Sequence, residues 1–281
     1  MIAFLHDRFL PEEQALVSVL DRGFLYGDGL FETVRAYHGR LFCWSQHYIR
    51  LAAGAGFLRI PLPMGESELG ARALELLARN ETGEALLRIT LTRGVGVRGY
   101  STRGAERPSL AMTVHPAPTP GPEGPAKWRL ATTSVHLLAG DPLARYKTCN
   151  KLPQIRAKAE AELLGADEGL LLGQDGSILE SSGANLFWIE DGRVRTTPLE
   201  SGVLAGVTRQ VVQALCRDLG LPFDEAVPQG ATLLAAEGVF LTTSGFEVVE
   251  AVSLDGQALR LSRITTTLRR AYHEKVEREC A

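Results

Sequence analysis

A proline- and glycine-rich stretch near the middle of the chain limits its possible folds most strongly. It runs from His115 to Ala126 and reads HPAPTPGPEGPA. Proline fixes φ and removes a backbone donor, so neither a helix nor a central strand continues through such a density. A segment of this composition is an extended, semi-rigid connector. The sequence therefore predicts two domains, residues 1–114 and 127–281, joined by a connector at residues 115–126.

Composition limits the class of protein. The chain has 281 residues, of which 45% are hydrophobic and 22% charged, enough for each domain to bury a core. A formal net charge of −3 offers no attraction for nucleic acid or an anionic membrane, so we expect no nucleic-acid partner. No apolar run approaches the roughly 20 residues of a membrane span. Charged residues interrupt the N-terminus too early for a secretory signal, so we expect neither membrane insertion nor secretion.

The cysteines and histidines indicate neither a metal cluster nor a disulfide framework. The cysteines are far apart, no Cys-x-x-Cys occurs, and no two histidines are four residues apart as in a helical metal site. We therefore expect no metal, and reduced thiols in a cytoplasmic protein. The four cysteines are Cys43, Cys149, Cys216 and Cys280.

The first half mixes strands and helices. Residues 29–37 and 40–44 flank His38–Gly39 and predict a hairpin. Residues 67–80 repeat apolar side chains at helical spacing and predict an amphipathic helix. Two further strands are expected at 85–94 and 109–115.

The second half begins with a strand at 128–135. A helix opened by Pro153 follows, with Ile155, Ala159 and Leu163 on one face. Two strand–turn–strand units then follow, with turns at 175–176 and 191–192, and a helix at 207–220 precedes a strand at 238–245. We expect an α+β fold in two domains. The Gly-x-Gly-x-x-Gly and P-loop motifs of dinucleotide and nucleoside triphosphate sites are missing from the sequence.

Lysine is rare in this chain, and its distribution is uneven. Five lysines stand among 30 basic residues, and three of the five fall within residues 144–172. Lys147 follows Tyr146 and precedes a helix start. Arginine solvates a surface as well as lysine does but does not act as a deprotonated amine. Lys147 is therefore a candidate for chemistry that needs an amine.

Two segments could bind an anion. Gly206 and Thr208 stand at the start of the 207–220 helix, where free backbone N–H groups and the helix dipole attract negative charge. The alternative is that Thr208 merely caps the helix. Residues 242–245 (TTSG) end a strand and would suit a phosphate or an ordinary turn.

A carboxylate completes the set. Glu180 stands in an apolar strand among small residues, where a buried carboxylate needs a partner; the alternative is that it alternates towards solvent. A lysine, a strand carboxylate and an anion-binding turn are the groups that pyridoxal 5′-phosphate (PLP) requires. The pattern permits this cofactor but does not require it.

The order of these segments resembles the fold-type IV PLP enzymes, which include branched-chain aminotransferases, D-amino acid aminotransferases and 4-amino-4-deoxychorismate lyases. The resemblance covers nearly the whole chain, and Glu180 follows Lys147 by 33 positions. It rests on six segments: DRGFLYGDGLFETVRAY (21–37), HYIRL (47–51), YKTCNKL (146–152), GADEGLLL (165–172), LESSGANLFW (179–188) and GVLAGVTRQ (202–210).

The resemblance implies roles for several residues. Lys147 corresponds to the Schiff-base lysine, and Glu180 to the carboxylate that pairs with the pyridine nitrogen of PLP. Arg50 corresponds to the phosphate arginine; the alternative is a solvated helix arginine. Three further residues correspond to phosphate-binding positions: Val207, Thr208 and Ser244. Ser244 departs from the threonine that the aminotransferases commonly show.

Two segments resemble the lyases in particular, namely residues 92–114 with their RGYS sequence and GDGLFETVR with its Thr33. The resemblance implies elimination of pyruvate from 4-amino-4-deoxychorismate to give 4-aminobenzoate, a folate-pathway reaction. Thr33 would pass a proton to the leaving group, and Arg98 and Tyr100 would bind a substrate carboxylate. The alternatives are a strand threonine that packs by its methyl group and a loop arginine.

A D-amino acid or branched-chain amino acid aminotransferase is the alternative activity. D-amino acid aminotransferases also carry an arginine in this loop, followed two residues later by histidine, where this chain has Tyr100. Two hypotheses from other classes remain: a protein that binds PLP without turnover, and an interaction domain with accidental motif matches.

The resemblance also implies an architecture. We expect a small α/β domain and a larger domain with a barrel-like sheet, with the cofactor between them. Such enzymes are homodimers with active sites near the subunit interface, and they act on a small-molecule amino substrate.

Overall fold

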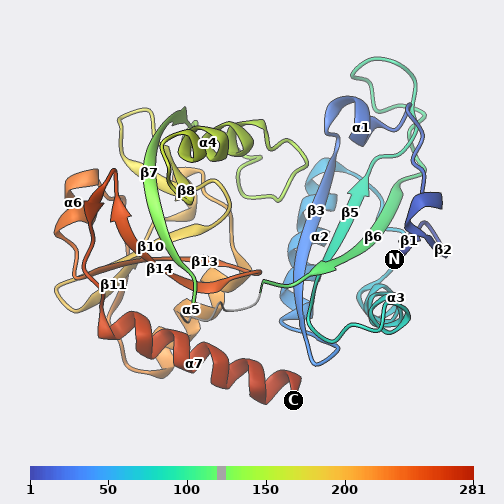
Figure 1. Cartoon of the computed structure of the whole chain (residues 1–281). Coiled ribbons are helices and arrows are strands. Elements are labelled where there is room, and N and C mark those ends of the chain that lie inside the picture. The colour runs from blue at the N-terminus through green and yellow to red at the C-terminus, as the bar shows by residue number, and fades with distance from the viewer. Residues whose placement is uncertain (119–124) are drawn as a thin grey trace. The chain divides into compact units, whose positions relative to one another are not determined.

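The computed structural model describes residues 1–118 and 125–281, which divide into two compact units (Figure 1). The first unit comprises Met1–Ala117, Tyr146–Asn150 and Val276–Ala281, and the second comprises Pro118–Arg145 and Lys151–Lys275. The predicted connector at 115–126 lies partly outside the described residues. Residues 146–150, which we had assigned to the second domain, group with the first unit.

The first unit is built on a six-stranded sheet with the order β2-β1-β6-β5-β3-β4. All of its strand pairs are antiparallel. The predicted hairpin at His38–Gly39 joins β3 and β4. The elements of this unit are β1 (Ile2–Leu5), β2 (Arg8–Pro11), the 3₁₀ turn η1 (Glu12–Gln14), α1 (Arg22–Tyr26), β3 (Gly29–Tyr37), β4 (Arg40–Leu41), α2 (Trp44–Leu58), α3 (Glu66–Arg79), β5 (Ala85–Thr92) and β6 (Ser109–Pro116).

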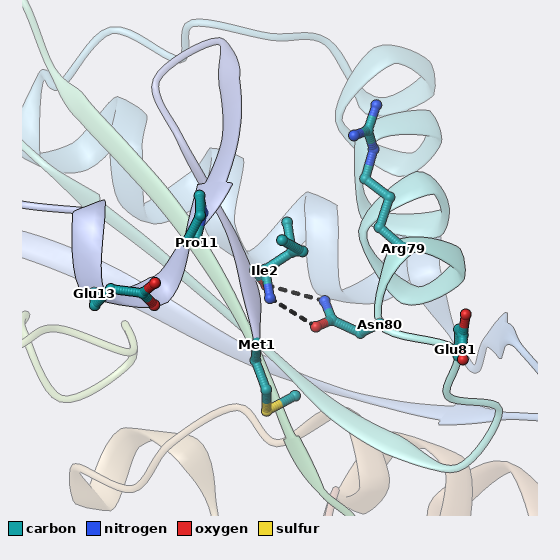
Figure 2. Close-up of a pocket in the computed structure, with 7 residues that line it drawn as sticks. All are labelled: Met1, Ile2, Pro11, Glu13, Arg79, Asn80 and Glu81. Carbon is teal, nitrogen blue, oxygen red and sulfur yellow. Dashed lines mark hydrogen bonds between the residues drawn. The ribbon is translucent and has the colours of Figure 1, made fainter.

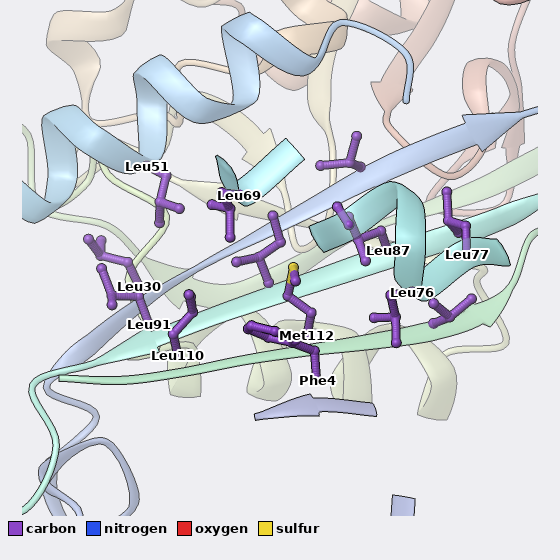
Figure 3. Packing of buried hydrophobic residues seen from close by; sticks show 14 of the residues in the cluster. Phe4, Leu30, Leu51, Leu69, Leu76, Leu77, Leu87, Leu91, Leu110 and Met112 are labelled. Atoms are coloured by element: carbon purple, nitrogen blue, oxygen red, sulfur yellow. The ribbon is translucent and has the colours of Figure 1, made fainter. Parts of the chain in front are cut away.

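The core of the first unit lies between one face of this sheet and helices α2 and α3 (Figure 3). Side chains of β5 alternate between buried and half-buried, as a strand with one covered face requires. The buried side chains of β5 meet the apolar face of α3, which includes Leu69 and Leu76. The opposite face of the sheet carries Phe31, Thr33 and Arg88, which are half-buried.

The second unit has a nine-stranded mixed sheet with the order β12-β11-β10-β13-β14-β7-β8-β9, and β15 pairs with β14. The sheet curls into a half barrel (Figure 1). Its elements are β7 (Lys127–His136), α4 (Leu152–Leu163), β8 (Glu168–Leu172), β9 (Ile178–Ser181), β10 (Asn185–Glu190), β11 (Arg193–Thr196), the 3₁₀ turn η2 (Leu199–Ser201), α5 (Val207–Asp218), β12 (Phe223–Glu225), α6 (Gly230–Ala235), β13 (Gly238–Thr243), β14 (Glu247–Leu254), β15 (Gln257–Ala258) and α7 (Arg263–Cys280).

Local signals placed the hairpins of the second unit correctly. Asp191 and Gly192 join β10 to β11 with φ values of 52° and 68°. A two-residue turn with both residues at positive φ matches the right-handed twist of the flanking strands. The sequence missed the parallel pair β7 and β8, which α4 connects. Their hydrogen bonds join segments far apart in the chain, which no local pattern reveals.

Helix α4 has the predicted apolar face, but that face is exposed. Ile155 is 61% and Leu163 is 89% accessible, whereas the helix buries Ala157 and Ala161 against β7 and β8. Small side chains let the helix approach the sheet closely, so the periodicity of the large apolar residues indicated the wrong side of α4 as its packing face. None of the described helices is long and apolar enough to cross a membrane.

Candidate active site

Lys147 is fixed beside β3 by backbone pairing. The Phe31 N–H donates to the Lys147 carbonyl at 2.9 Å, and the Cys149 N–H donates to the Gly29 carbonyl at 2.9 Å. Strand β4 pairs only with the far end of β3, at Ala36 and Tyr37, so the edge near Phe31 accepts residues 146–150 instead. This pairing explains why a segment between β7 and α4 belongs to the first unit.

Two cations lie against the same aromatic ring. Lys147 Nζ is 4.6 Å from the Phe31 ring centroid, and Arg88 Cζ is 4.0 Å from it. Burial lowers the pKa of Arg88, although nearby Cys149 opposes the shift. Within the described residues, no carboxylate pairs with Arg88. A half-buried guanidinium of this kind, close to an amine, suits an anionic group of a ligand.

Thr33 lies directly across from Arg88 in the β3–β5 ladder. Side chains of one strand alternate between faces, so Phe31 and Thr33 share a face and Glu32 points to the other. Thr33 is therefore on the same sheet face as the ring that contacts Lys147. This position leaves its predicted role as a proton donor a prediction.

Arg50 is held by a buried carboxylate. Its Nε donates to Glu32 Oε1 and its Nη2 donates to Glu32 Oε2, each at 2.7 Å, and His47 Nδ1 lies 2.8 Å from Glu32 Oε2. His47 and Arg50 are three residues apart on α2, so they share a helix face. The two bonds use one edge of the guanidinium. The solvated-arginine alternative is wrong, because the side chain of Arg50 is only 9% exposed.

The charges of this cluster shift two pKa values. Burial alone would raise the pKa of Glu32, but the charge and hydrogen bonds of Arg50, assisted by His47, lower it to about 2. Burial lowers the pKa of His47 against the opposing effect of Glu32, and Arg50 and Lys147 lower it further. Glu32 is therefore ionised at neutral pH. Sequence reasoning missed Glu32 and His47, although both stand in the quoted segments.

In the second unit, Glu180 is buried on β9 and is 8% exposed, so the solvent-facing alternative is wrong. Its Oε2 accepts hydrogen bonds from the Leu204 N–H at 3.1 Å and from Asn185 Nδ2 at 3.2 Å. Asn185 Nδ2 also donates to the Leu204 carbonyl at 2.9 Å. These N–H donors favour the ionised carboxylate over the neutral acid.

The start of α5 offers backbone donors. Gly206 is the N-cap residue, no side chain caps the helix, and Thr208 is the second helical residue, so the capping alternative for Thr208 is wrong. A Cβ on Gly206 would lie 2.0 Å from Asn185 Oδ1, so no other residue fits between Asn185 and the helix. The uncapped first turn at Val207 and Thr208 is suited to an anion.

Ser244 follows β13 and is half-buried. A nearby residue that sequence reasoning left unassigned is Thr242, which lies across from Asn185 in the β10–β13 ladder. Its buried Oγ1 has no hydrogen-bond partner within the described residues. A buried hydroxyl without a partner indicates a missing ligand or water. Its signal was the TTSG cluster itself.

These groups fit PLP by their chemistry. The first unit supplies the amine of Lys147 and the guanidinium of Arg50. The second unit supplies the Glu180 carboxylate, the donors at the start of α5 and the unpartnered Thr242 hydroxyl. An aldehyde, a pyridine nitrogen and a phosphate need an amine, a carboxylate and clustered donors in that order.

Arg98 and Tyr100 lie apart from this set of groups. Both are exposed on the loop between β5 and β6, and Tyr100 is 88% accessible. A second feature of the first unit is a shallow pocket of about 440 Å³ (Figure 2). There, the Asn80 side chain bonds both the N–H and the carbonyl of Ile2. None of the predicted site residues lines the pocket, which is formed by Met1, Ile2, Pro11, Glu13, Arg79, Asn80 and Glu81.

Comparisons with known proteins agree with this chemistry. Residues 29–254 match the family model described as amino-transferase class IV. The chain is 34% identical over 279 residues to a putative branched-chain-amino-acid aminotransferase of Methanocaldococcus jannaschii, covering 98% of this chain and 96% of the relative. It is 28% identical over 263 residues to the D-alanine aminotransferase of Bacillus licheniformis, covering 92% and 90%.

Solved structures show the same fold. A branched-chain aminotransferase of T.th. with pyridoxamine 5′-phosphate has a TM-score of 0.91 and 28% identity, covering 97% of this chain and 93% of that one. The 4-amino-4-deoxychorismate lyase from Pseudomonas aeruginosa has a TM-score of 0.85 and 28% identity, covering 97% and 98%. The expected fold and the PLP cofactor are thereby confirmed.

Proposed function

The chain belongs to the class IV aminotransferase family of PLP-dependent enzymes, and we propose that it is an aminotransferase acting on a small amino acid. The observation that carries the proposal is the placement of Lys147 and Arg88 on one Phe31 ring, at 4.6 and 4.0 Å. An amino acid substrate brings an amine and a carboxylate close together, and these two side chains offer a proton acceptor and an anion partner. The aminotransferase names of the relatives support the choice.

Each residue has a role in this proposal. Bound PLP supplies an electron-withdrawing ring that stabilises negative charge at the substrate α-carbon. The Glu180 carboxylate holds a proton on the pyridine nitrogen, and Asn185 and the Leu204 N–H keep that carboxylate ionised and oriented. Arg50, Val207, Thr208 and Ser244 bind the phosphate. The Lys147 amine removes the α-proton and returns it during transfer.

Substrate recognition belongs to the open sheet face. Arg88 binds a carboxylate of the substrate, because a half-buried guanidinium gains most from an ionic hydrogen-bonding partner. Arg98 and Tyr100 bind a substrate carboxylate from the β5–β6 loop. Phe31 separates Lys147 from Arg88 and limits the size of the substrate side chain.

The second candidate is 4-amino-4-deoxychorismate lyase in folate biosynthesis. Thr33 favours it, because a hydroxyl stands across from Arg88 on the face that carries Phe31. In that reaction Thr33 would give a proton to departing pyruvate, and loss of the enolpyruvyl group would leave an aromatic ring. The similar lyase structure supports keeping this candidate.

One parallel experiment separates the two activities. Purified enzyme is incubated with aminodeoxychorismate, D-alanine and L-leucine separately, and 4-aminobenzoate and pyridoxamine phosphate are measured. Rapid conversion of the cofactor by an amino acid, with little aminobenzoate, is the expected result. Fast aminobenzoate formation without cofactor conversion would replace the aminotransferase by the lyase.

We also propose a homodimer, located in the cytoplasm. Exposed apolar side chains gather on the first unit, where Asp21 bridges Val95 and Tyr26 contacts Tyr100. Such a patch on a water-soluble enzyme fits an interface. Its members are Leu16, Val17, Val19, Leu20, Phe24, Leu25, Val95, Val97 and Tyr100. Sedimentation analysis tests the oligomeric state, and a monomer at assay concentration would exclude the dimer.

A further inference from the structure

The loop of residues 93–108 between β5 and β6 carries Arg98 and Tyr100 but has little regular structure of its own. A loop of this length depends on contacts outside itself for a fixed conformation. Helix α1 lies at the same end of the first unit's sheet as this loop (Figure 1). The contacts between α1 and the loop therefore decide where Arg98 and Tyr100 are presented.

Arg22, the first residue of α1, binds three consecutive carbonyls of the loop. Its Nη1 donates to the Gly99 carbonyl at 2.8 Å and to the Ser101 carbonyl at 3.1 Å, and Nη2 donates more weakly to the Tyr100 carbonyl at 3.4 Å. Nε donates to Asp28 Oδ2 at 2.8 Å. Arg22 is only 3% exposed. A buried arginine of this kind is satisfied only while the loop keeps its path.

Tyr26, one helical turn after Arg22, contacts the same part of the loop. Its hydroxyl accepts a hydrogen bond from the Gly99 N–H at 3.0 Å. Its ring lies 5.0 Å from Arg22 Cζ and meets the Tyr100 ring edge-on at 5.7 Å. Both polar groups of Gly99, which has a φ of 107°, are thus bound by α1.

The base of the loop is closed by Asp21, the N-cap residue of α1. Its Oδ2 accepts from Thr92 Oγ1 at 2.9 Å and from Ser109 Oγ at 2.7 Å, which are the last residue of β5 and the first of β6. Its Oδ1 accepts from the Gly23 N–H at 2.7 Å and starts the helix. One buried carboxylate therefore joins both stems of the loop to α1.

The loop also packs tightly over Arg22. A Cβ on Gly96 would lie 3.0 Å from Arg22 Cδ and 2.8 Å from the Ala105 side chain. A Cβ on Gly94, which has a φ of 80°, would lie 1.9 Å from the Arg107 carbonyl. The chain has glycine at both close approaches, so the loop conformation and the Arg22 contacts are mutually dependent.

We propose that Arg22 is the positioning residue that fixes the 93–108 loop and thereby orients Arg98 and Tyr100 towards the carboxylate of an amino acid substrate. Arg22 acts through backbone carbonyls and does not touch the substrate. The inference rests on the proposed function only in the substrate contacts of Arg98 and Tyr100. The ordering of the loop by Arg22 is a separate property.

The test compares Arg22→Lys with Arg93→Lys in the intact holoenzyme. Arg93 also donates to Asp28, but its other bonds go to the carbonyls of Leu58 and Arg59 at the end of α2. Each variant keeps a positive charge beside Asp28 and loses the fork of donors. Lysine also preserves the trypsin site at each position, so the digestion maps stay comparable.

Two readouts are measured on each protein. Limited trypsin digestion reports loop order through cleavage after Arg98, and steady-state transamination separates KM from kcat. Arg22→Lys should raise the cleavage rate after Arg98 roughly tenfold and the amino acid KM by a similar factor, with a smaller change in kcat. Arg93→Lys should leave both close to wild type.

Three outcomes would overturn the proposal: an unchanged cleavage rate in Arg22→Lys, an unchanged KM despite faster cleavage, or equal effects of Arg93→Lys. A failure of the proposed function looks different. It would appear as no transamination by the wild-type enzyme, and the cleavage comparison would still report on the ordering of the loop.

Discussion

Lys147 Nζ lies 4.6 Å from the centroid of the Phe31 ring, and the backbones of these two residues are joined by a hydrogen bond from the Phe31 N–H to the Lys147 carbonyl. A residue that follows β7 in the chain is thereby held on the sheet of the other unit. The bond fixes the backbone, and the ring limits the directions open to the amine. This relationship makes Lys147 the residue on which the first prediction depends.

Borohydride reduction of the holoenzyme should attach a pyridoxyl group to Lys147. Peptide mapping by mass spectrometry would locate the label. Lys147→Arg should take up no label, because a guanidinium stays protonated and does not react with the aldehyde. Lys158→Arg serves as the control and should label normally. A label on Lys151 or Lys127 would contradict the assignment.

Glu180→Gln should retain PLP but slow turnover by about 100-fold or more, because a neutral amide no longer favours protonation of the pyridine nitrogen. Single-turnover kinetics with an α-deuterated amino acid would place the loss in proton abstraction. The exposed Glu162→Gln on α4 is the matched control. Wild-type rates in folded Glu180→Gln would refute the role.

Arg50→Ala should weaken PLP binding by roughly 10- to 100-fold, because it removes charge-assisted contacts to a phosphate. Pyridoxal, which lacks the phosphate, should bind the variant and the wild type alike. Equilibrium dialysis of the apoenzyme with both ligands measures the difference. Equal losses for the two ligands would mean that Arg50 has a structural role only.

Arg88→Gln should raise the amino acid KM about tenfold or more and leave the affinity for PLP unchanged, because the lost cation would pair with a substrate carboxylate. Steady-state kinetics and cofactor titration test the two parts. Arg129→Gln, which removes a surface arginine paired with Asp167, should change neither. A fall in cofactor affinity would place Arg88 at the cofactor instead.

The stability of the apoenzyme should fall on acidification in two stages. The folded pKa of His47 is lowered, so stability begins to fall as pH drops below 6.5, where the unfolded histidine takes up a proton. The folded pKa of Glu32 is about 2 against an ordinary 4.5, so its contribution is present above 4.5 and disappears as pH falls towards 2. This contribution is about 3 kcal/mol.

Urea denaturation at several pH values measures both stages. Glu32→Gln should remove the lower stage and should itself destabilise the fold, because it leaves Arg50 and His47 without their anion. His47→Asn should remove the upper stage. A variant that keeps the wild-type pH profile would mean that its group does not titrate as described.

Sequence patterns predicted the elements whose signals are local. The Asp191–Gly192 turn, the helix at 67–80 and the α5 helix depend on backbone preferences and on side chains within one or two turns. The same holds for the shortage of lysine around Lys147 and for the carboxylate in the Glu180 strand, since both are visible in single segments. The roles of these residues came from the order of the motifs, which resembled a known family.

The sequence by itself determined the hairpins, the main helices and the identity of the reactive amine and carboxylate, because each is written in neighbouring residues. Only the tertiary structure decided that residues 146–150 pair with β3, that α4 exposes its large apolar side chains, and that Glu32 and Arg22 hold Arg50 and the 93–108 loop. These contacts join residues distant in sequence. Their energy depends on burial and on the geometry of donors and acceptors, which exist only once the chain has folded.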